Sequence, residues 1–297
     1  IPFFGLTMAS GDCENVKIGI IGGTGLESFE LFEMNCTKTV NTPYGSPSSE
    51  LICGTLHGVD CIIIARHGKV HDIMPSDINN RLCFLLFFMC IAFVLCVTSF
   101  FLYASSSMCI MWEEGCTLVL ATTACGSLRA EYEPTDFAIL DQFIDRTTKR
   151  DSTFYDGKPG HLKGVCHISM RNPFSEKLRQ LLIAACEENG VKHHKTGTAI
   201  TIEGPRFSTY AESHLYRSWG GSIINMTTVP EVVLAAELGL LYASLALVTD
   251  YDCWRDDYEA VSVEHVMQTM AVNKQNALKV IATAVANASK QKWSDDI

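Results

Sequence analysis

The sequence predicts an α/β fold, and the pattern of its apolar runs leads to this class. Runs of strand length alternate with stretches of helical periodicity, and several runs are apolar throughout, as strands buried on both faces are. At least five runs end in Gly, Thr, Arg, His or Asp, which gathers polar groups at one edge of the sheet. The length of 297 residues leaves room for one or two domains.

The composition favours a protein that acts on small molecules over one that binds nucleic acid. The net charge is −10 and Lys and Arg do not cluster, so we expect no nucleic-acid surface. The thirteen cysteines lack the paired C-x-x-C spacing of zinc sites, and we expect most of them to be reduced thiols in a cytoplasmic or nuclear protein. The adjacent His193 and His194 have no partner motif, so we expect no metal site there.

The first strand is expected at residues 16–21, where a β-branched run breaks into the glycine-rich string GGTG around Thr24. Glycines at a strand end let backbone N–H groups turn inward, and the Thr24 hydroxyl adds a donor to this small anion cradle. The same string is also typical of a tight turn, and it lacks the full dinucleotide and P-loop signatures.

A hairpin is expected at residues 51–68, with its turn at His57 and Gly58. Its second strand ends in Arg66 and His67, which offer two donors to an anion, Arg66 through its planar fork. A solvated strand end would carry the same residues, so this motif alone leaves both interpretations open.

The remaining elements alternate in the same way along the chain. The expected elements are a strand at 116–123 ending in Thr122, Thr123 and Ala124, a turn and a strand within 133–146, a helix from its N-cap Asn172 to Gly190, a strand ahead of Glu203, a helix at 211–220, a strand at 240–248, and a helix at 262–290 capped by Ser262. The strand at 240–248 is followed by Thr249, Asp250, Tyr251 and Asp252.

The stretch 222–231, reading SIINMTTVPE, is the one around which the site is arranged. It begins as a buried strand and switches to Asn225, Met226 and Thr227, before a proline ends the ladder and Glu231 opens a helix. The carboxyl ends of strands are where open α/β sheets bind ligands. An ordinary strand end with helix-capping threonines would have the same pattern.

The polar strand ends form two chemical groups. One group supplies donors without an acid, which suits an anion such as inorganic phosphate: Thr24, Arg66, His67, Thr123 and Thr227. The other supplies an aromatic face, a thioether and carboxylates, which suit a nitrogen heterocycle: Phe207, Ser208, Asn225, Met226, Asp250 and Asp252. A phosphate beside a heterocycle indicates phosphorolysis of a nucleoside.

The strings GIIGGTG, ARHG, TTACGSL, DQFIDRT, TIEGPRFST, INMTTVPE and TDYDCW occur in this order. Together they resemble the trimeric purine nucleoside phosphorylase superfamily, and within it the methylthioadenosine phosphorylase family. The resemblance covers nearly the whole chain from Val16 to about Trp293. It implies a single α/β domain with a central mixed sheet, a homotrimer, and phosphorolysis of 5′-methylthioadenosine to adenine and 5-methylthioribose 1-phosphate. It implies no cofactor, inorganic phosphate being a co-substrate, and no membrane partner.

The resemblance also assigns roles to single residues. It places Thr24, Arg66, His67, Thr123, Ala124 and Thr227 at the phosphate, and Phe207, Ser208, Asn225, Met226, Asp250, Asp252 and Val263 at the nucleoside. Asp250 is the catalytic residue, because a carboxyl at N7 of the purine stabilises the negative charge that builds on the leaving base. Asp250 can donate a proton only if burial or Asp252 raises its pKa from about 3.9.

Two positions favour an adenine nucleoside within the superfamily. Sister enzymes that act on 6-oxopurines have Asn where Asp250 stands and His where Val263 stands. An Asp carboxylate suits the amino group of adenine. An apolar wall at Val263 accepts a methylthio group, whereas a free 5′-hydroxyl there would lack a hydrogen-bond partner. A 6-oxopurine or broad-specificity phosphorylase remains the alternative enzyme.

The chain departs from the family at residues 82–112, which contain no charged residue and exceed the length of about 20 that a membrane helix needs. A single membrane span there would separate Arg66 from Thr123 and Asp250, so span and catalysis exclude each other. We therefore expect an anomalous apolar insertion, of the kind a splicing variant produces, within one domain at 8–297. The alternative is an inactive splice form. Residues 1–7 precede a natural-looking start at Met8, and we expect a non-native leader.

Overall fold

The computed structural model describes residues 16–22, 31–40, 44, 46–68, 73–79, 111, 114–258 and 261–296. The expected leader at 1–7, Thr24, and the apolar run at 82–112 apart from Met111 lie outside the described residues. Within the described ranges, no helix combines the length and the apolar composition that a membrane crossing requires.

Three parallel strands form the centre of the sheet. Strand β1 (Ile18–Gly22) is buried along its whole length and lies between β4 (Val59–Ala65) and β5 (Leu118–Ser127). Because all three run in the same direction, their carboxyl ends reach the same edge of the sheet. The hairpin predicted from the sequence is confirmed, as β3 (Leu51–Leu56) pairs antiparallel with β4 across the turn at His57 and Gly58.

Strand β5 is longer than the sequence suggested, and it carries three neighbours. Its first half pairs with β1 on one side, its last two residues pair antiparallel with β10 (Ile223–Asn225), and β11 (Leu241–Asp250) runs parallel beside it from Leu118 onward. The expected strand end at Thr123 is therefore wrong. The strand continues to Ser127 because β10 and β11 supply hydrogen-bond partners for its polar half.

The outer strands make the sheet mixed, as predicted. Edge strand β2 (Phe32–Lys38) pairs antiparallel with β3, while β9 (Thr198–Ile202) and β7 (Gln142–Arg146) extend the opposite side in parallel with β10. Two short strands complete the described part: β6 (Phe137–Ile139), antiparallel to β11, and β8 (His193–His194), parallel to β6.

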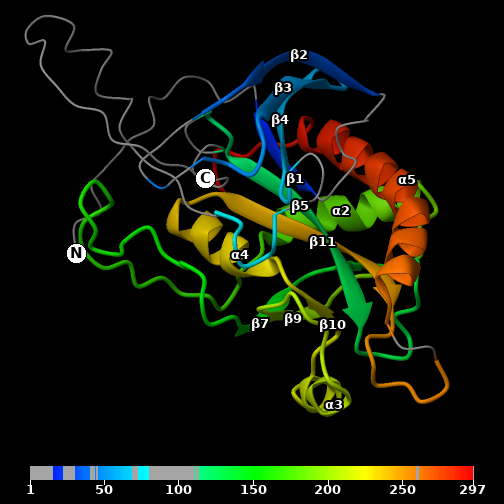
Figure 1. The fold of residues 1–297 in the computed structure, drawn as a ribbon. Coiled ribbons are helices and arrows are strands. Elements are labelled where there is room, and N and C mark those ends of the chain that lie inside the picture. Colours follow the sequence, from blue (N-terminus) through cyan, green and yellow to red (C-terminus); the bar gives the residue numbers. More distant parts are fainter. Residues whose placement is uncertain are drawn as a thin grey trace, which may run out of the picture.

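Helices cover the two faces of the sheet (Figure 1). Helices α2 (Glu176–Glu188) and α5 (Val263–Ala288) pack on one face, in a core that includes Ile18, Ile20 and Leu245. Helix α4 (Thr228–Glu237) packs on the other face, in a second core with Ile21 and Val248. Alternate residues of β1 enter opposite cores, as the two-residue period of a strand requires.

Local capping chemistry decides where the helices begin. The expected N-cap Asn172 is wrong: α2 is capped by Ser175, whose hydroxyl accepts the backbone N–H of Leu178. Helix α5 has the predicted cap, because the Ser262 hydroxyl accepts the backbone N–H of His265.

The other two helices begin near the expected positions. Helix α3 (Tyr210–Ser218) has a full capping box between Thr209 and Glu212. Helix α4 begins at Thr228 rather than at Glu231, although Val229 inside it has non-helical backbone angles.

Candidate active site

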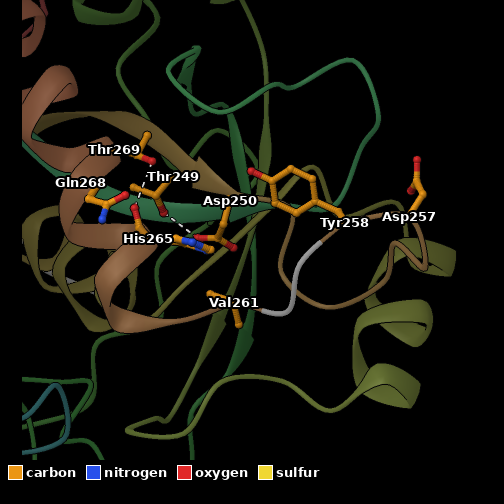
Figure 2. Close-up of a pocket in the computed structure, with 8 residues that line it drawn as sticks. All are labelled: Thr249, Asp250, Asp257, Tyr258, Val261, His265, Gln268 and Thr269. Atoms are coloured by element: carbon orange, nitrogen blue, oxygen red, sulfur yellow. Dashed lines mark hydrogen bonds between the residues drawn. The ribbon is translucent and has the colours of Figure 1, made fainter.

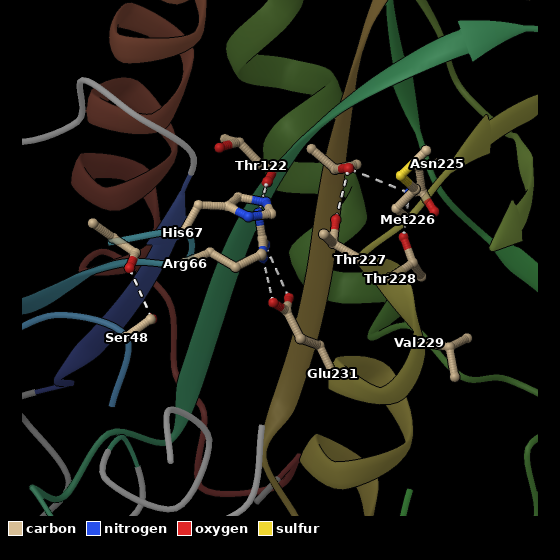
Figure 3. A network of polar contacts seen from close by, with 12 residues as sticks. Ser48, Arg66, His67, Thr122, Asn225, Met226, Thr227, Thr228, Val229 and Glu231 are labelled. Atoms are coloured by element: carbon tan, nitrogen blue, oxygen red, sulfur yellow. Dashed lines mark hydrogen bonds and ion pairs between the residues drawn. The ribbon is translucent and has the colours of Figure 1, made fainter. Parts of the chain in front are cut away.

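Arg66 follows the end of β4 and is held by a buried ion pair. Its Nε and Nη2 donate to the two carboxylate oxygens of Glu231 on α4, with Nη2 to Oε2 at 2.9 Å, and its Nη1 donates to the Thr122 carbonyl at 2.7 Å. The two side chains point toward each other in Figure 3, and both are almost fully buried. These bonds leave N–H groups on both terminal nitrogens for a further acceptor.

The Arg66 ion pair balances charge inside the protein. Burial lowers the pKa of Arg66, but the charge and hydrogen bonds of Glu231 outweigh burial and raise it. The Tyr242 hydroxyl donates to Glu231 Oε2 at 3.0 Å and fixes the carboxylate from the β11 side. Glu231 was read from the sequence only as the start of a helix, so its role as the partner of Arg66 was missed.

His67 and the end of β4 are fixed by neighbouring backbone. His67 Nδ1 lies 2.9 Å from the Ile73 carbonyl oxygen. The Ser48 hydroxyl donates to the Ala65 carbonyl at 2.9 Å, and the Ala65 N–H donates to the Ser49 hydroxyl at 3.0 Å. The segment before β3 therefore sets the direction in which Arg66 and His67 leave the sheet.

Two threonines from distant parts of the chain meet beside β5. The hydroxyl oxygens of Thr123 and Thr227 are 3.0 Å apart, and Thr227 is the N-cap residue of α4 without making a side-chain cap. Every residue of β5 is buried except Ala124, so the strand opens to solvent next to this hydroxyl pair. The exposed Ala124 is therefore a point of solvent access beside two hydroxyl-bearing residues that are themselves buried.

Asn225 organises these hydroxyls from the end of β10. Its Nδ2 donates to Thr228 Oγ1 at 2.6 Å and to Thr123 Oγ1 at 3.3 Å, and its Oδ1 accepts from Thr201 at 3.0 Å. The side chain is buried and uses both its oxygen and its nitrogen within the protein. Asn225, expected at the nucleoside, is thus positioned to orient the threonines.

Met226 is held on both sides. Arg150 donates through Nη1 to the Met226 carbonyl and, at 2.8 Å, to the Val229 carbonyl. The Met226 sulfur packs against Gly204, where an added Cβ would lie 2.6 Å from that sulfur and the φ angle is +72°. Met226 is half-buried, so part of its surface remains accessible.

Asp250 ends β11, and both of its oxygens accept hydrogen bonds. The Thr249 hydroxyl donates to Oδ2 at 2.6 Å, and the Asp252 backbone N–H donates to Oδ1 at 2.7 Å. Gly126 of β5 lies directly beside this carboxyl, since an added Cβ would stand 2.9 Å from Oδ1. The carboxyl orientation is therefore determined by Thr249, Asp252 and Gly126 together.

Burial shifts both aspartates in the direction that acid catalysis needs. Burial raises the pKa of Asp250, and the hydrogen bonds from Thr249 and Asp252 oppose this only in part. Burial also raises the pKa of Asp252, and the charge of Asp250 adds to that rise, against the hydroxyl of Ser213. A raised pKa favours the protonated carboxyl, which is the form that can donate a proton to a base.

A pocket of about 410 Å³ opens at Asp250 (Figure 2). Its wall combines the end of β11 with the loop and first turns of α5: Thr249, Asp250, Asp257, Tyr258, Val261, His265, Gln268 and Thr269. The residues beyond Asp250 were missed in the sequence. The available signal was the three- and four-residue spacing of His265, Gln268 and Thr269, which places polar groups on one helix face.

Of the other residues expected at the nucleoside, one lies close to the aspartates and two are exposed. Ser208 is close to the aspartates, because the Cys253 thiol next to Asp252 donates to the Ser208 carbonyl at 3.2 Å. Phe207 is 38% exposed, and Val263 is 65% exposed at the first turn of α5. Val261, and not Val263, lines the pocket of this single chain.

Comparison with known proteins gives one consistent family. A family model described as the phosphorylase superfamily matches residues 17–286. The S-methyl-5′-thioadenosine phosphorylase of Ciona intestinalis is 58% identical over 290 residues, covering 98% of this chain and 95% of that protein. The enzyme of the same name from Danio rerio is 47% identical over 283 residues, covering 95% and 92%.

Solved structures agree with these relatives. Methylthioadenosine phosphorylase from Schistosoma mansoni in complex with adenine superposes with a TM-score of 0.84 at 38% identity, covering 95% of each chain. A variant of adenosine/methylthioadenosine phosphorylase from the same organism, in complex with methylthioadenosine, gives a TM-score of 0.83 at 38% identity, covering 95% and 94%.

Proposed function

The chain belongs to the phosphorylase superfamily, and we propose that it catalyses the phosphorolysis of 5′-methylthioadenosine to adenine and 5-methylthioribose 1-phosphate. It is an enzyme of the pentosyltransferase type with an α/β fold of one domain. Relatives with this activity in their name align along nearly the full chain, and two of the aligned structures contain adenine and methylthioadenosine.

The proposal rests on the positions of Thr123 and Asp250 relative to strand β5. Strand β5 presents Thr123, and three residues later Gly126, whose register partner on β11 is Asp250. At a rise of about 3.3 Å per residue, the backbone positions of Thr123 and Gly126 lie roughly 10 Å apart along the strand. We propose that a bound nucleoside spans these two positions, with its ribose between the anion and the purine.

We assign the anion position to inorganic phosphate. Thr123, Thr227 and the free N–H groups of Arg66 offer donors beside the exposed Ala124, and Glu231 neutralises the guanidinium. Phosphate there is bound mainly by oriented hydrogen bonds and less by net charge. His67, at the end of β4, and Thr24, which lies outside the described residues, complete the proposed set.

We assign the purine position to Asp250, with Asp252 and Ser208 beside it. During the reaction a phosphate oxygen attacks C1′ of the ribose, the C1′–N9 bond breaks, and its electron pair moves into the purine. Protonation of N7 by Asp250 stabilises that negative charge. The raised pKa of Asp250 favours the protonated carboxyl that this step requires.

Two side chains, Met226 and Val261, suit an apolar 5′ substituent, although the pocket wall also carries the polar His265, Gln268 and Thr269. Met226 is held by Arg150 and Gly204, and Val261 lines the pocket near Asp250. An apolar wall accepts the sulfur and methyl of a methylthio group, because neither atom needs a hydrogen-bond partner from the protein. Val263 is 65% exposed in the single chain, and its contact with the substrate stays a prediction.

We further propose that the enzyme uses no cofactor, acts in the cytoplasm or nucleus, and assembles as a homotrimer from one domain at 8–297. Val263 and Met267 lie one helical turn apart on α5 and are 65% and 62% exposed, which supports an interface there. Sedimentation velocity tests the oligomer: a single species of monomer mass contradicts it.

The function is tested by comparing three nucleosides with and without phosphate. Methylthioadenosine, adenosine and inosine are incubated with the full chain, and the released base is quantified by chromatography. We expect adenine release that requires phosphate and is fastest with methylthioadenosine. Faster release of hypoxanthine from inosine would assign the protein to the 6-oxopurine enzymes instead.

A further inference from the structure

Two cysteines face each other on the outer hairpin of the sheet. In the antiparallel pairing of β2 with β3, Cys36 is the register partner of Cys53. The register shifts between Met34 and Cys36, so Asn35 is the extra residue of a bulge. Residues that are directly opposite in an antiparallel pair present their side chains on the same face of the sheet.

The pairing places the two backbones at a spacing suited to a disulfide. Directly opposite residues in antiparallel strands have Cα atoms about 4.5 or 5.5 Å apart, depending on the pair type. Disulfides join Cα atoms that are usually about 4.4–6.8 Å apart. Both pair types fall within this range, so the bond requires rotation of the side chains and little movement of the strands.

The thiols of this pair are in contact and reach solvent. Cys36 is exposed, Cys53 is partly buried, and both are free thiols. Burial raises the pKa of the Cys53 thiol, the Lys38 ammonium lowers it, and Cys36 raises it again through charge and a side-chain hydrogen bond. Four other cysteines of the described part are buried: Cys61, Cys116, Cys125 and Cys186.

We propose that Cys36 and Cys53 form a reversible cross-strand disulfide when the protein meets a small disulfide such as oxidised glutathione. The exposed Cys36 thiolate attacks one sulfur of the small disulfide, forms a mixed disulfide and releases one thiol. The Cys53 thiolate then attacks the Cys36 sulfur, and the second small thiol leaves. Two protein thiols are oxidised, one small disulfide is reduced to two thiols, and the protein loses two protons.

The bond would lock an edge strand that is held from one side. Strand β2 ends the sheet, and β3 is its hydrogen-bonded neighbour within the described residues. A cross-link at this position restricts the unfolded chain and keeps β2 paired. Oxidation is therefore expected to raise Tm and to slow amide exchange at Phe32–Lys38, while the residues around Asp250 keep their positions.

Peptide mapping tests the proposal directly. The full chain is equilibrated with glutathione buffers of graded ratio, alkylated, and digested with trypsin without reduction. Cleavage after Lys17, Lys38 and Arg66 places Cys36 and Cys53 in different peptides. We expect a linked pair of these peptides that disappears on reduction, and a protein mass lower by two hydrogen atoms.

Two serine variants identify the bond. Cys53 and Cys61 share one tryptic peptide, so Cys53→Ser should abolish the linked pair and Cys61→Ser should leave it. If a variant fails to fold, fragmentation of the linked wild-type peptides between Cys53 and Cys61 identifies the bonded cysteine. The proposal is overturned if native protein yields only glutathione adducts on Cys36, or if the linked pair survives in Cys53→Ser.

Discussion

The hydroxyl of Thr123 lies 3.0 Å from the hydroxyl of Thr227, although the two residues are 104 positions apart in the chain. The contact joins the middle of β5 to the start of α4, next to the exposed Ala124. Each hydroxyl can donate one hydrogen bond and accept others, so the pair can turn both donors toward an anion. We therefore place the proposed phosphate position at this pair.

Thr227→Val removes one of these donors and keeps the side-chain shape. A hydrogen bond to a charged group is worth about 1.5–3 kcal/mol, so we expect KM for phosphate to rise about 10- to 100-fold. KM for methylthioadenosine should change much less. Thr227→Ser retains the hydroxyl and should stay close to wild type; an equal loss in both variants would contradict the assignment.

Glu231→Gln leaves the buried Arg66 without its charged partner. Breaking a buried ion pair from one side costs about 3–5 kcal/mol, which denaturant unfolding measures as a lower free energy of unfolding. Because Arg66 also loses its fixed orientation, we expect KM for phosphate to rise more than KM for the nucleoside.

Tyr242→Phe is the matched control for this network. It removes a single hydrogen bond to Glu231, for which we expect a cost of about 1 kcal/mol, and it keeps the ion pair. Equal destabilisation by the two variants would show that the charge balance at Arg66 is not what holds the site.

Gly126→Ala should disturb catalysis through Asp250. The added methyl group would lie 2.9 Å from Asp250 Oδ1 against a strand backbone, so the carboxyl must move. We expect a fall in kcat of at least about tenfold, with KM for phosphate nearly unchanged. Gly197→Ala is the control, since its new methyl group meets ordinary contacts at 3.5 Å; equal losses of kcat would refute the argument.

Thr249→Val should move the pH profile in a definite direction. Burial raises the pKa of Asp250, and the Thr249 hydroxyl opposes burial by stabilising the ionised carboxylate. Without the hydroxyl the pKa of Asp250 rises further, so the protonated acid persists to higher pH. The basic limb of kcat/KM should therefore shift upward in Thr249→Val and stay in place in Thr249→Ser. A downward shift would mean that the reaction uses the ionised carboxylate.

The sequence predicted the fold class and most strands because their apolar runs are long and end in polar residues. The strand ends could be grouped, since parallel strands such as β4 and β5 bring their carboxyl ends to one edge. The extent of β5 could not be predicted. Its polar half, from Thr122 to Gly126, becomes strand only because β10 and β11 satisfy its backbone groups.

Contacts between candidate site residues that are far apart in the chain could not be predicted from the sequence either. Glu231 and Arg66 are 165 positions apart, and only the packing of α4 against the sheet joins them. The hydrogen bonds of Asn225 could not be predicted for a related reason, because its three partners lie on β5, β9 and α4. In contrast, the placement of Asp250 at the end of a buried strand could be predicted, because the apolar run before it is continuous.

Adenine release from methylthioadenosine by wild type and Asp250→Asn, with and without phosphate, tests the central claim most directly. We predict that wild-type release requires phosphate, and that Asp250→Asn lowers kcat by at least about 100-fold while KM for phosphate stays within a few-fold of wild type. The account is contradicted if Asp250→Asn retains the wild-type kcat, or if wild type releases adenine equally well without phosphate.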